Sequence, residues 1–203
     1  ASVFFHILPF IEQQNAYNLT LQPSDPHGNN VGWNNGKVNY PTYSPFWNVL
    51  HVNTKTYVCP SDPTNVGTSG WNSGLSSYAY NGQTFHVQWA PQMRYPSSIT
   101  DGTSNTIFYT DQQSKCTGFW PDWGPSIADS NWPQPTGPAS MFLMQPRNAN
   151  ACYRNALAST FHTGGINVAL GDGSVRNIAQ GISGTTWWYA LTPNGGEVLG
   201  PDW

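Results

Sequence analysis

The chain has 203 residues, enough for one sizeable domain or two small ones. Charged residues make up only 8% of it, against about 25% in an ordinary soluble protein, while aromatic residues make up 14%. Seven Lys and Arg without a basic cluster argue against nucleic acid as a partner. No stretch approaches the ~18 apolar residues of a membrane-spanning helix. The aromatic content predicts a packed core, and the weakly charged surface favours self-association.

The N-terminal part predicts one short helix followed by loops. Apolar positions over 7–17, with Pro9 near the first turn, fit an amphipathic helix, the only substantial helix we expect. The stretch 20–52 is dense in Gly, Pro and Asn, which predicts several turns. Alternating Val and Thr over 52–58 then predict a strand, which Pro60 stops.

The middle of the chain predicts β-structure and one irregular insertion. Asn81-Gly82 lies between alternating aromatic residues, a pattern typical of a β-hairpin. Asp101-Gly102 predicts a second turn, and the β-rich stretch "TIFYTDQQ" that follows predicts a strand. The segment at about 116–152 has too many Pro and Trp for regular structure, and we interpret it as a long surface insertion.

The stretch "FHTGGINVALGDGSVRNIAQ" gives the clearest local prediction. Apolar residues alternate from 166 to 170 and resume at 175 and 178, with a Gly-Asp-Gly-Ser turn at 171–174 between them. This pattern predicts a β-hairpin. After it, "TTWWYAL" predicts a strand or a short helix, and an Asn-Gly-Gly turn leads to an extended tail. The fold class we expect is α+β: a single domain over 1–203, mostly antiparallel sheet with long loops.

Five segments in order carry a family resemblance: "LPFIEQQNAYN", "TYVCPSDP", "SSYAYNG", "ITDGTSNTI" and "FHTGGINVALGDGSVRNIA". The series resembles a large bacterial family of prepilin-like proteins of unknown function with an H-x9-DG signature near the C-terminus. The chain is similar to the globular part of such proteins, without the long N-terminal pilin helix. The resemblance implies a pilin-like domain, export to the cell surface or exterior, and no established catalytic activity. The Trp/Pro-rich insertion departs from the shared pattern.

The signature residues are His162, Gly171, Asp172 and Gly173. We expect Asp172 to accept backbone N–H groups in its own turn and His162 to donate to a nearby carbonyl, a structural role. An acid–base or metal role for the two is the alternative, although no motif places a nucleophile beside them. Asp101, Ser104, Asn105 and Asp111 offer oxygen ligands for Ca²⁺, but their spacing fits an Asx-type turn better. We expect no metal and no cofactor.

The three cysteines form an odd set. Cys116 and Cys152 flank the insertion and could close it as a disulfide, which would leave Cys59 without a partner in this chain. Three buried free thiols are the alternative. No Cys/His spacing indicates zinc.

Two further features concern the surface. Trp120, Trp123 and Trp132 in the insertion could contact a neighbouring subunit, stack on carbohydrate or cover the domain's own core. Asn18 begins the sole N-x-[ST] sequon and could carry a glycan.

The function we expect is a non-enzymatic structural one: a subunit of an extracellular filament of identical copies, joined by terminal segments and aromatic surface. The ends "ASVFF" and "EVLGPDW" could each add to the sheet edge of a neighbour. A cell-surface carbohydrate-binding module that uses exposed Trp is the alternative. A hydrolase built on His162 and Asp172 has the least support, because no second acid or nucleophile accompanies them.

Overall fold

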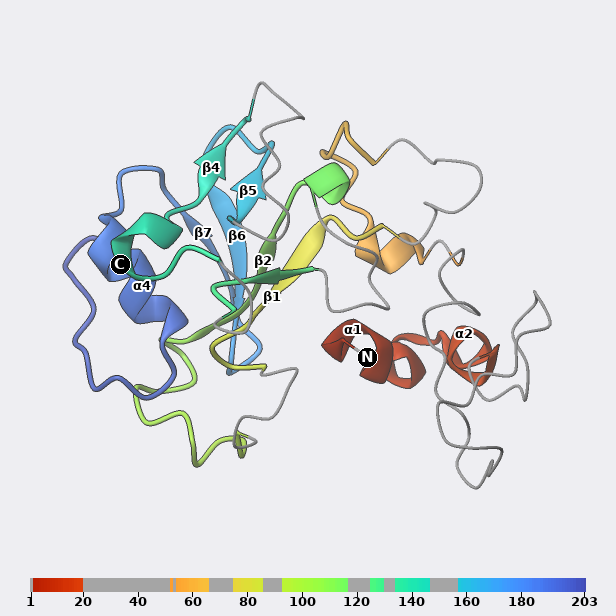
Figure 1. The fold of residues 1–203 in the computed structure, drawn as a ribbon, viewed down its shortest axis with the longest axis horizontal. Coiled ribbons are helices and arrows are strands. Elements are labelled where there is room, and N and C mark those ends of the chain that lie inside the picture. Colours follow the sequence, from red (N-terminus) through yellow and green to blue (C-terminus); the bar gives the residue numbers. More distant parts are fainter. Residues whose placement is uncertain are drawn as a thin grey trace.

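A computed structural model of the chain describes residues 2–19, 52, 54–65, 75–85, 93–116, 125–129, 134–146 and 157–203. A five-stranded sheet in the order β3-β1-β2-β6-β7 lies at its centre (Figure 1). The strands are β1 Tyr78–Asn81, β2 Ile107–Asp111, β3 Ser126–Ile127, β6 Ile166–Leu170 and β7 Val175–Ile178. All pairings in this sheet are antiparallel except that of β3 with β1. The expected α+β fold with a mostly antiparallel sheet is confirmed at this level.

Short elements surround the sheet. The two-residue strands β4 (Leu143–Met144) and β5 (Ser159–Thr160) pair in parallel beside it. The α-helices are α1 Val3–His6, α2 Gln14–Leu19 and α4 Gly184–Leu191, and the 3-10 helices are η1 Leu8–Ile11, η2 Lys55–Tyr57, η3 Ser114–Cys116 and η4 Gly137–Ser140. None of the described helices has the length and apolar composition needed to cross a membrane.

The single N-terminal helix expected over 7–17 is wrong in detail. The chain forms α1, η1 and α2 in succession, because Glu12 adopts a left-handed conformation with φ 59° and ends η1. The expectation of only one substantial helix is also wrong. The longest described helix is α4, and its N-cap Ser183 accepts the backbone N–H of Thr186.

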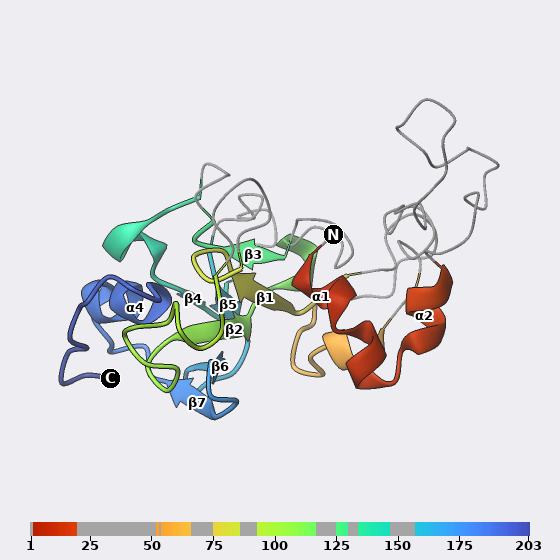
Figure 2. The same cartoon turned by 90° about the horizontal axis from the view of Figure 1, so that it is seen from below.

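Alternation along β1, and an irregularity in β2 between Ile107 and Tyr109, send side chains to two separate cores. Ala79 and Ile107 point to the face covered by α4, where Trp187 is fully buried. Tyr80 and Tyr109 point to the other face and pack against the N-terminal helices. The sheet therefore lies between α4 on one side and α1 on the other (Figure 2).

Two predicted β-features are wrong. Residues 55–57 form η2 rather than part of a strand, because Tyr57 is drawn into the aromatic core beside Phe4. The hairpin at Asn81-Gly82 does not form, because β1 already pairs with β2 on one edge and with β3 on the other. The turn at Asp101-Gly102 and the strand that follows it are confirmed.

The hairpin predicted over 166–178 is confirmed. Strands β6 and β7 pair in antiparallel register from Ile166↔Ile178 to Ala169↔Val175. Beyond α4, the C-terminal tail folds back onto the domain: Asp202 accepts the backbone N–H of Ser183 at 2.7 Å and the hydroxyl of Thr186 at 2.6 Å. Both contacts hold the tail at the N-terminal end of α4.

Candidate functional site

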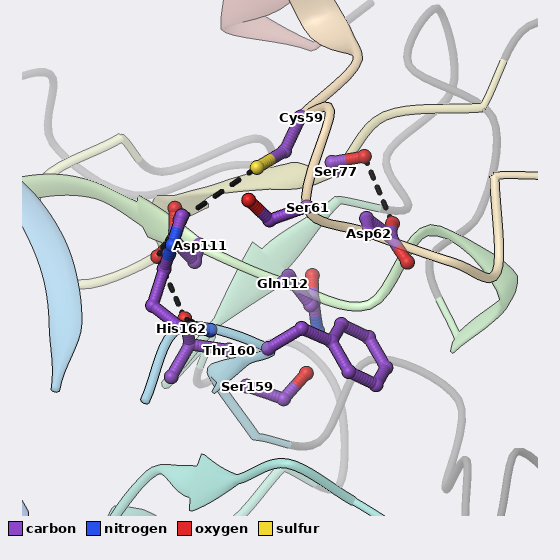
Figure 3. Close-up of a pocket in the computed structure, with 10 residues that line it drawn as sticks. Cys59, Ser61, Asp62, Ser77, Asp111, Gln112, Ser159, Thr160 and His162 are labelled. Atoms are coloured by element: carbon purple, nitrogen blue, oxygen red, sulfur yellow. Dashed lines mark hydrogen bonds and ion pairs between the residues drawn. The ribbon is translucent and has the colours of Figure 1, made fainter. Parts of the chain in front are cut away.

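A small polar pocket opens where four distant segments meet (Figure 3). The turn 59–62, the residue before β1, the end of β2 and the segment from β5 to His162 supply its walls. The lining residues are Cys59, Ser61, Asp62, Ser77, Asp111, Gln112, Ser159, Thr160, Phe161 and His162. Local sequence patterns do not predict this site as a unit, because its parts are up to 103 residues apart.

Asp62 holds the walls of the pocket together. Its carboxylate accepts the N–H and the hydroxyl of Thr64 at 2.9 and 2.6 Å within the turn. It also accepts the hydroxyl of Ser77 and the backbone N–H of Ser114, both at 2.9 Å. Four hydrogen bonds occupy this buried carboxylate, which ties the turn 59–64 to the residue before β1 and to the start of η3. The role of Asp62 is structural.

Asp111 is the second buried carboxylate. Its Oδ2 accepts the Thr160 hydroxyl at 3.0 Å and the Asn167 backbone N–H at 3.1 Å, and it lies 3.8 Å from Nε2 of His162. Burial raises the pKa of this carboxyl above its ordinary value, and the Asn167 N–H, the Thr160 hydroxyl and His162 oppose the rise. At a given pH a larger fraction of this carboxyl is therefore protonated than of an exposed one.

His162 lies between Asp111 and Cys59. Its Nε2 is 3.7 Å from Sγ of Cys59, and its side chain is 31% exposed. These contacts differ from the expected hydrogen bond to a backbone carbonyl. The backbone N–H of His162 donates to the Thr160 hydroxyl, which holds His162 close to the end of β5. An imidazole in this position can take a proton from the thiol and stay close to a carboxylate that stabilises its charge.

Tyr78, in β1, lies beside Cys59. Burial, and then the neighbouring Cys59 and Asp111, raise the pKa of its phenol to about 12. The Tyr78 hydroxyl therefore stays protonated across the physiological range and can donate a hydrogen bond to the Cys59 sulfur.

Asp172 is far from this cluster. Its Oδ1 accepts the N–H and hydroxyl of Ser174 at 2.9 and 2.6 Å, and these bonds lower the pKa of this fully exposed carboxyl. Gly173 completes the turn with φ 85°. The five residues of β6, roughly 17 Å of extended chain, separate Asp172 from His162. The expected turn role of Asp172 agrees with this geometry, and the His162–Asp172 pair does not form.

The other candidate residues lie elsewhere. Asp101 accepts the backbone N–H groups of Gly195 and Gly196 at 2.9 Å, so the possible Ca²⁺ ligands do not converge on Asp111. Among the described residues, no group of three His, Cys, Asp or Glu is arranged to hold a metal ion. Asn18 is exposed on α2 and accepts a hydrogen bond from Gln14.

The remaining candidates fall outside the described part of the chain. These are Cys152, Trp120, Trp123 and Trp132, together with the side chain of Cys116. Both the disulfide and the aromatic contacts assigned to them stay predictions.

Cys59 and Asp111 are the residues that sequence reasoning missed. From the sequence, Cys59 is only the cysteine that a Cys116–Cys152 disulfide would leave without a partner, and Asp111 is only a possible calcium ligand. The signal that could have found Cys59 is the placement of Cys59, Tyr78 and His162 inside three of the five segments that carry the family resemblance, whereas Asp111 lies in none of the five. The structure brings these three segments to one pocket.

Comparison with known proteins gives a family and no activity. No curated protein sequence and no solved structure matches the chain. One family model matches residues 2–184, a range that includes all five segments. The chain belongs to the family described as "Protein of unknown function (DUF1559)".

Proposed function

We propose that this protein is a non-enzymatic structural subunit of an extracellular bacterial filament, in which copies of the chain associate head to tail. The carrying observation is the position of two exposed apolar side chains. Phe10 in η1 is 84% exposed, and Val198 in the C-terminal tail is 87% exposed. The N-terminal helices and the C-terminal tail lie at opposite sides of the molecule (Figures 1 and 2). A contact between two different surfaces repeats from copy to copy instead of closing as a dimer.

The composition supports the same proposal. Charged residues make up 8% of the chain, so little charge repulsion opposes the approach of a second copy. The resemblance to prepilin-like proteins also supports the proposal, because such proteins are expected to be exported and to polymerise. These arguments favour a filament over a monomeric surface protein.

The N-terminal helix and the C-terminal tail are both packed against their own domain, and this packing bears on how two subunits can join. Phe4 and Phe5 of α1 are buried in the aromatic core, and Asp202 binds the tail to the start of α4. An exchange of strands would first have to remove these segments from their own domain. We therefore place the subunit contacts on the folded surfaces around Phe10 and Val198.

Electron microscopy and analytical ultracentrifugation of the purified chain, over a hundredfold range of concentration, test the proposal. We expect filaments whose amount rises with concentration, and loss of them in F10E and in V198E. V175E is the matched control, because Val175 is 70% exposed on β7 and lies on neither terminal segment. Wild-type chain that stays monomeric throughout would overturn the proposal.

A mixing experiment tests the head-to-tail geometry. An F10E subunit keeps the intact Val198 surface, so it should bind one end of a filament and stop growth there. We expect small amounts of F10E to shorten wild-type filaments, and F10E and V198E together to form dimers. If the two variants never associate, the contact joins like surfaces and the geometry is wrong.

The carbohydrate-binding alternative can be tested on the same purified proteins. Affinity electrophoresis in polysaccharide gels, with the triple variant W120A/W123A/W132A beside wild type, measures it directly. Retardation of wild-type monomers without filament formation would favour that alternative.

A further inference from the structure

The pocket at Cys59 has the parts of a nucleophilic thiol site, a feature that a filament subunit does not require. Cys59 forms no disulfide with any described residue and is partly exposed. Its sulfur points to His162 Nε2, 3.7 Å away (Figure 3). The Asp111 carboxylate lies 3.8 Å from the same nitrogen. A thiol beside an imidazole that can hold its proton is the usual arrangement for an activated cysteine.

A second, independent feature points to a ligand. The side chain of Gln112 is 2% exposed and lines the pocket, and its Oε1 has no hydrogen-bond partner among the described residues. Its Nε2 donates to the carbonyl of Leu157 at 3.2 Å, which establishes the orientation of the amide. A buried carbonyl without a donor is unfavourable, so the pocket favours a ligand that brings an N–H group.

We propose that Cys59 is a nucleophile that captures a small aminothiol from its disulfide. The thiol provides the sulfur chemistry, and the Gln112 carbonyl with the Asp111 carboxylate receives the ammonium group. The inward position of the thiol suits a small molecule better than a second copy. A disulfide between two chains needs their Cα atoms within about 7 Å of each other, and the sulfur here faces inward to His162.

The reaction balances without any further reagent. His162 takes the proton of Cys59, and the sulfur attacks one sulfur atom of the disulfide. The bond between Cys59 Sγ and that sulfur forms as the original S–S bond breaks. The electron pair leaves on the second sulfur, which receives a proton from His162. Cys59 is oxidised to a mixed disulfide, and one aminothiol molecule is released in the reduced form.

The reaction of the full-length, reduced chain with cystamine at pH 6 tests the proposal. Intact mass and peptide mapping give the rate at Cys59. We expect this rate to exceed by about tenfold that of the same cysteine in the urea-unfolded chain, because an ordinary thiol is almost wholly protonated at pH 6. We expect H162Q to lose most of that advantage. The groups that face Cys59 and shape its pH profile are Asp62, Tyr78, Asp111 and His162.

Three probes of similar size test the ligand class. Cystamine carries amines, bis(2-hydroxyethyl) disulfide carries hydroxyls, and 3,3′-dithiodipropionate carries carboxylates. Each native rate is divided by the rate for the unfolded chain, which removes the intrinsic reactivity of the probe. We expect the order amine, hydroxyl, carboxylate, with a difference of at least about tenfold between the first and the last. In Q112L the preference for the amine should fall while the reaction itself continues.

The native-to-unfolded comparison needs no variant, so the proposal stays testable if H162Q does not fold. A native Cys59 that reacts no faster than the unfolded chain overturns it. Equal rates in wild type and a folded H162Q overturn the role of His162. Covalent dimers through Cys59, or a Cys59 already paired with Cys116 or Cys152, overturn the small-molecule partner. Filament formation is measured separately, so neither result depends on the other.

Discussion

We expect truncation of the Asn81 side chain to lower the free energy of unfolding strongly, although the side chain is small. It is fully buried at the end of β1. Its Nδ2 donates to the carbonyls of Ile107 and Leu191, both at 2.7 Å, and its Oδ1 accepts the backbone N–H of Gln83 at 2.9 Å. One amide therefore connects β1, β2 and the end of α4. Truncation to Ala leaves these backbone groups without their partner inside the domain.

The expected magnitude follows from these bonds. Each buried carbonyl without a donor costs about 1–3 kcal/mol, so N81A should lower the free energy of unfolding by about 3 kcal/mol. With a typical urea m-value of about 2 kcal/mol per molar, the midpoint should fall by about 1.5 M. N81D should cost more, because a carboxylate would face two carbonyl oxygens, and its penalty should grow as the pH rises. Equilibrium urea unfolding followed by Trp fluorescence measures both.

Asn177 supplies the control for this prediction. It is exposed on β7, where its Nδ2 donates to Oδ1 of Asn167. N177A should change the free energy of unfolding by less than about 1 kcal/mol. If N81A is no more destabilising than N177A, the three-way connection through Asn81 does not contribute to stability, and the reasoning is refuted.

Two further predictions concern the site and the hairpin. Because the pKa of Asp111 is raised in the folded state, the native chain binds more protons than the unfolded chain above the ordinary carboxyl range, so wild type should lose stability there as pH rises. D111N should remove that loss, and melting temperatures from pH 4 to 8 check it; parallel curves would contradict the raised pKa. G165A should cost about 3 kcal/mol, because an added Cβ would contact the Ile178 carbonyl and the Asn177 side chain. G173A should cost only about 1 kcal/mol, because its φ of 85° is strained for Ala but the space is open, and equal urea midpoints for the two variants would show this contrast to be wrong.

Local sequence patterns predict those parts of the sheet that are formed by residues close together in the chain. The hairpin of β6 and β7 follows from alternation and a Gly-Asp-Gly turn within one short stretch. The same logic failed at Asn81-Gly82, where a hairpin signal belongs to a buried Asn that bonds to Leu191, 110 residues away. The sequence of α4 is compatible with a strand or a helix, because its Thr and Trp residues favour strands. In the structure Ser183 provides the N-cap of a helix.

The candidate site shows the same limit more strongly. The sequence directed attention to His162 through the signature, and His162 does face other titratable groups. Its partners were beyond reach, because Cys59 and Asp111 become neighbours only when the turn 59–62, β2 and the segment after β5 pack together. The spacing from His162 to Asp172 suggested a pair in sequence, and β6 holds the two apart.

The two buried carboxylates of the pocket indicate which residues give shape and which can do chemistry. Asp62 accepts four hydrogen bonds from groups on both sides of the turn, so its negative charge is compensated by fixed donors. Asp111 accepts two and faces an imidazole, and burial raises its pKa. A carboxyl whose pKa burial raises and which faces an imidazole is suited to proton transfer, so we assign that role to Asp111. His162 therefore lies between the Asp111 carboxyl and the Cys59 thiol, whose proton it can accept.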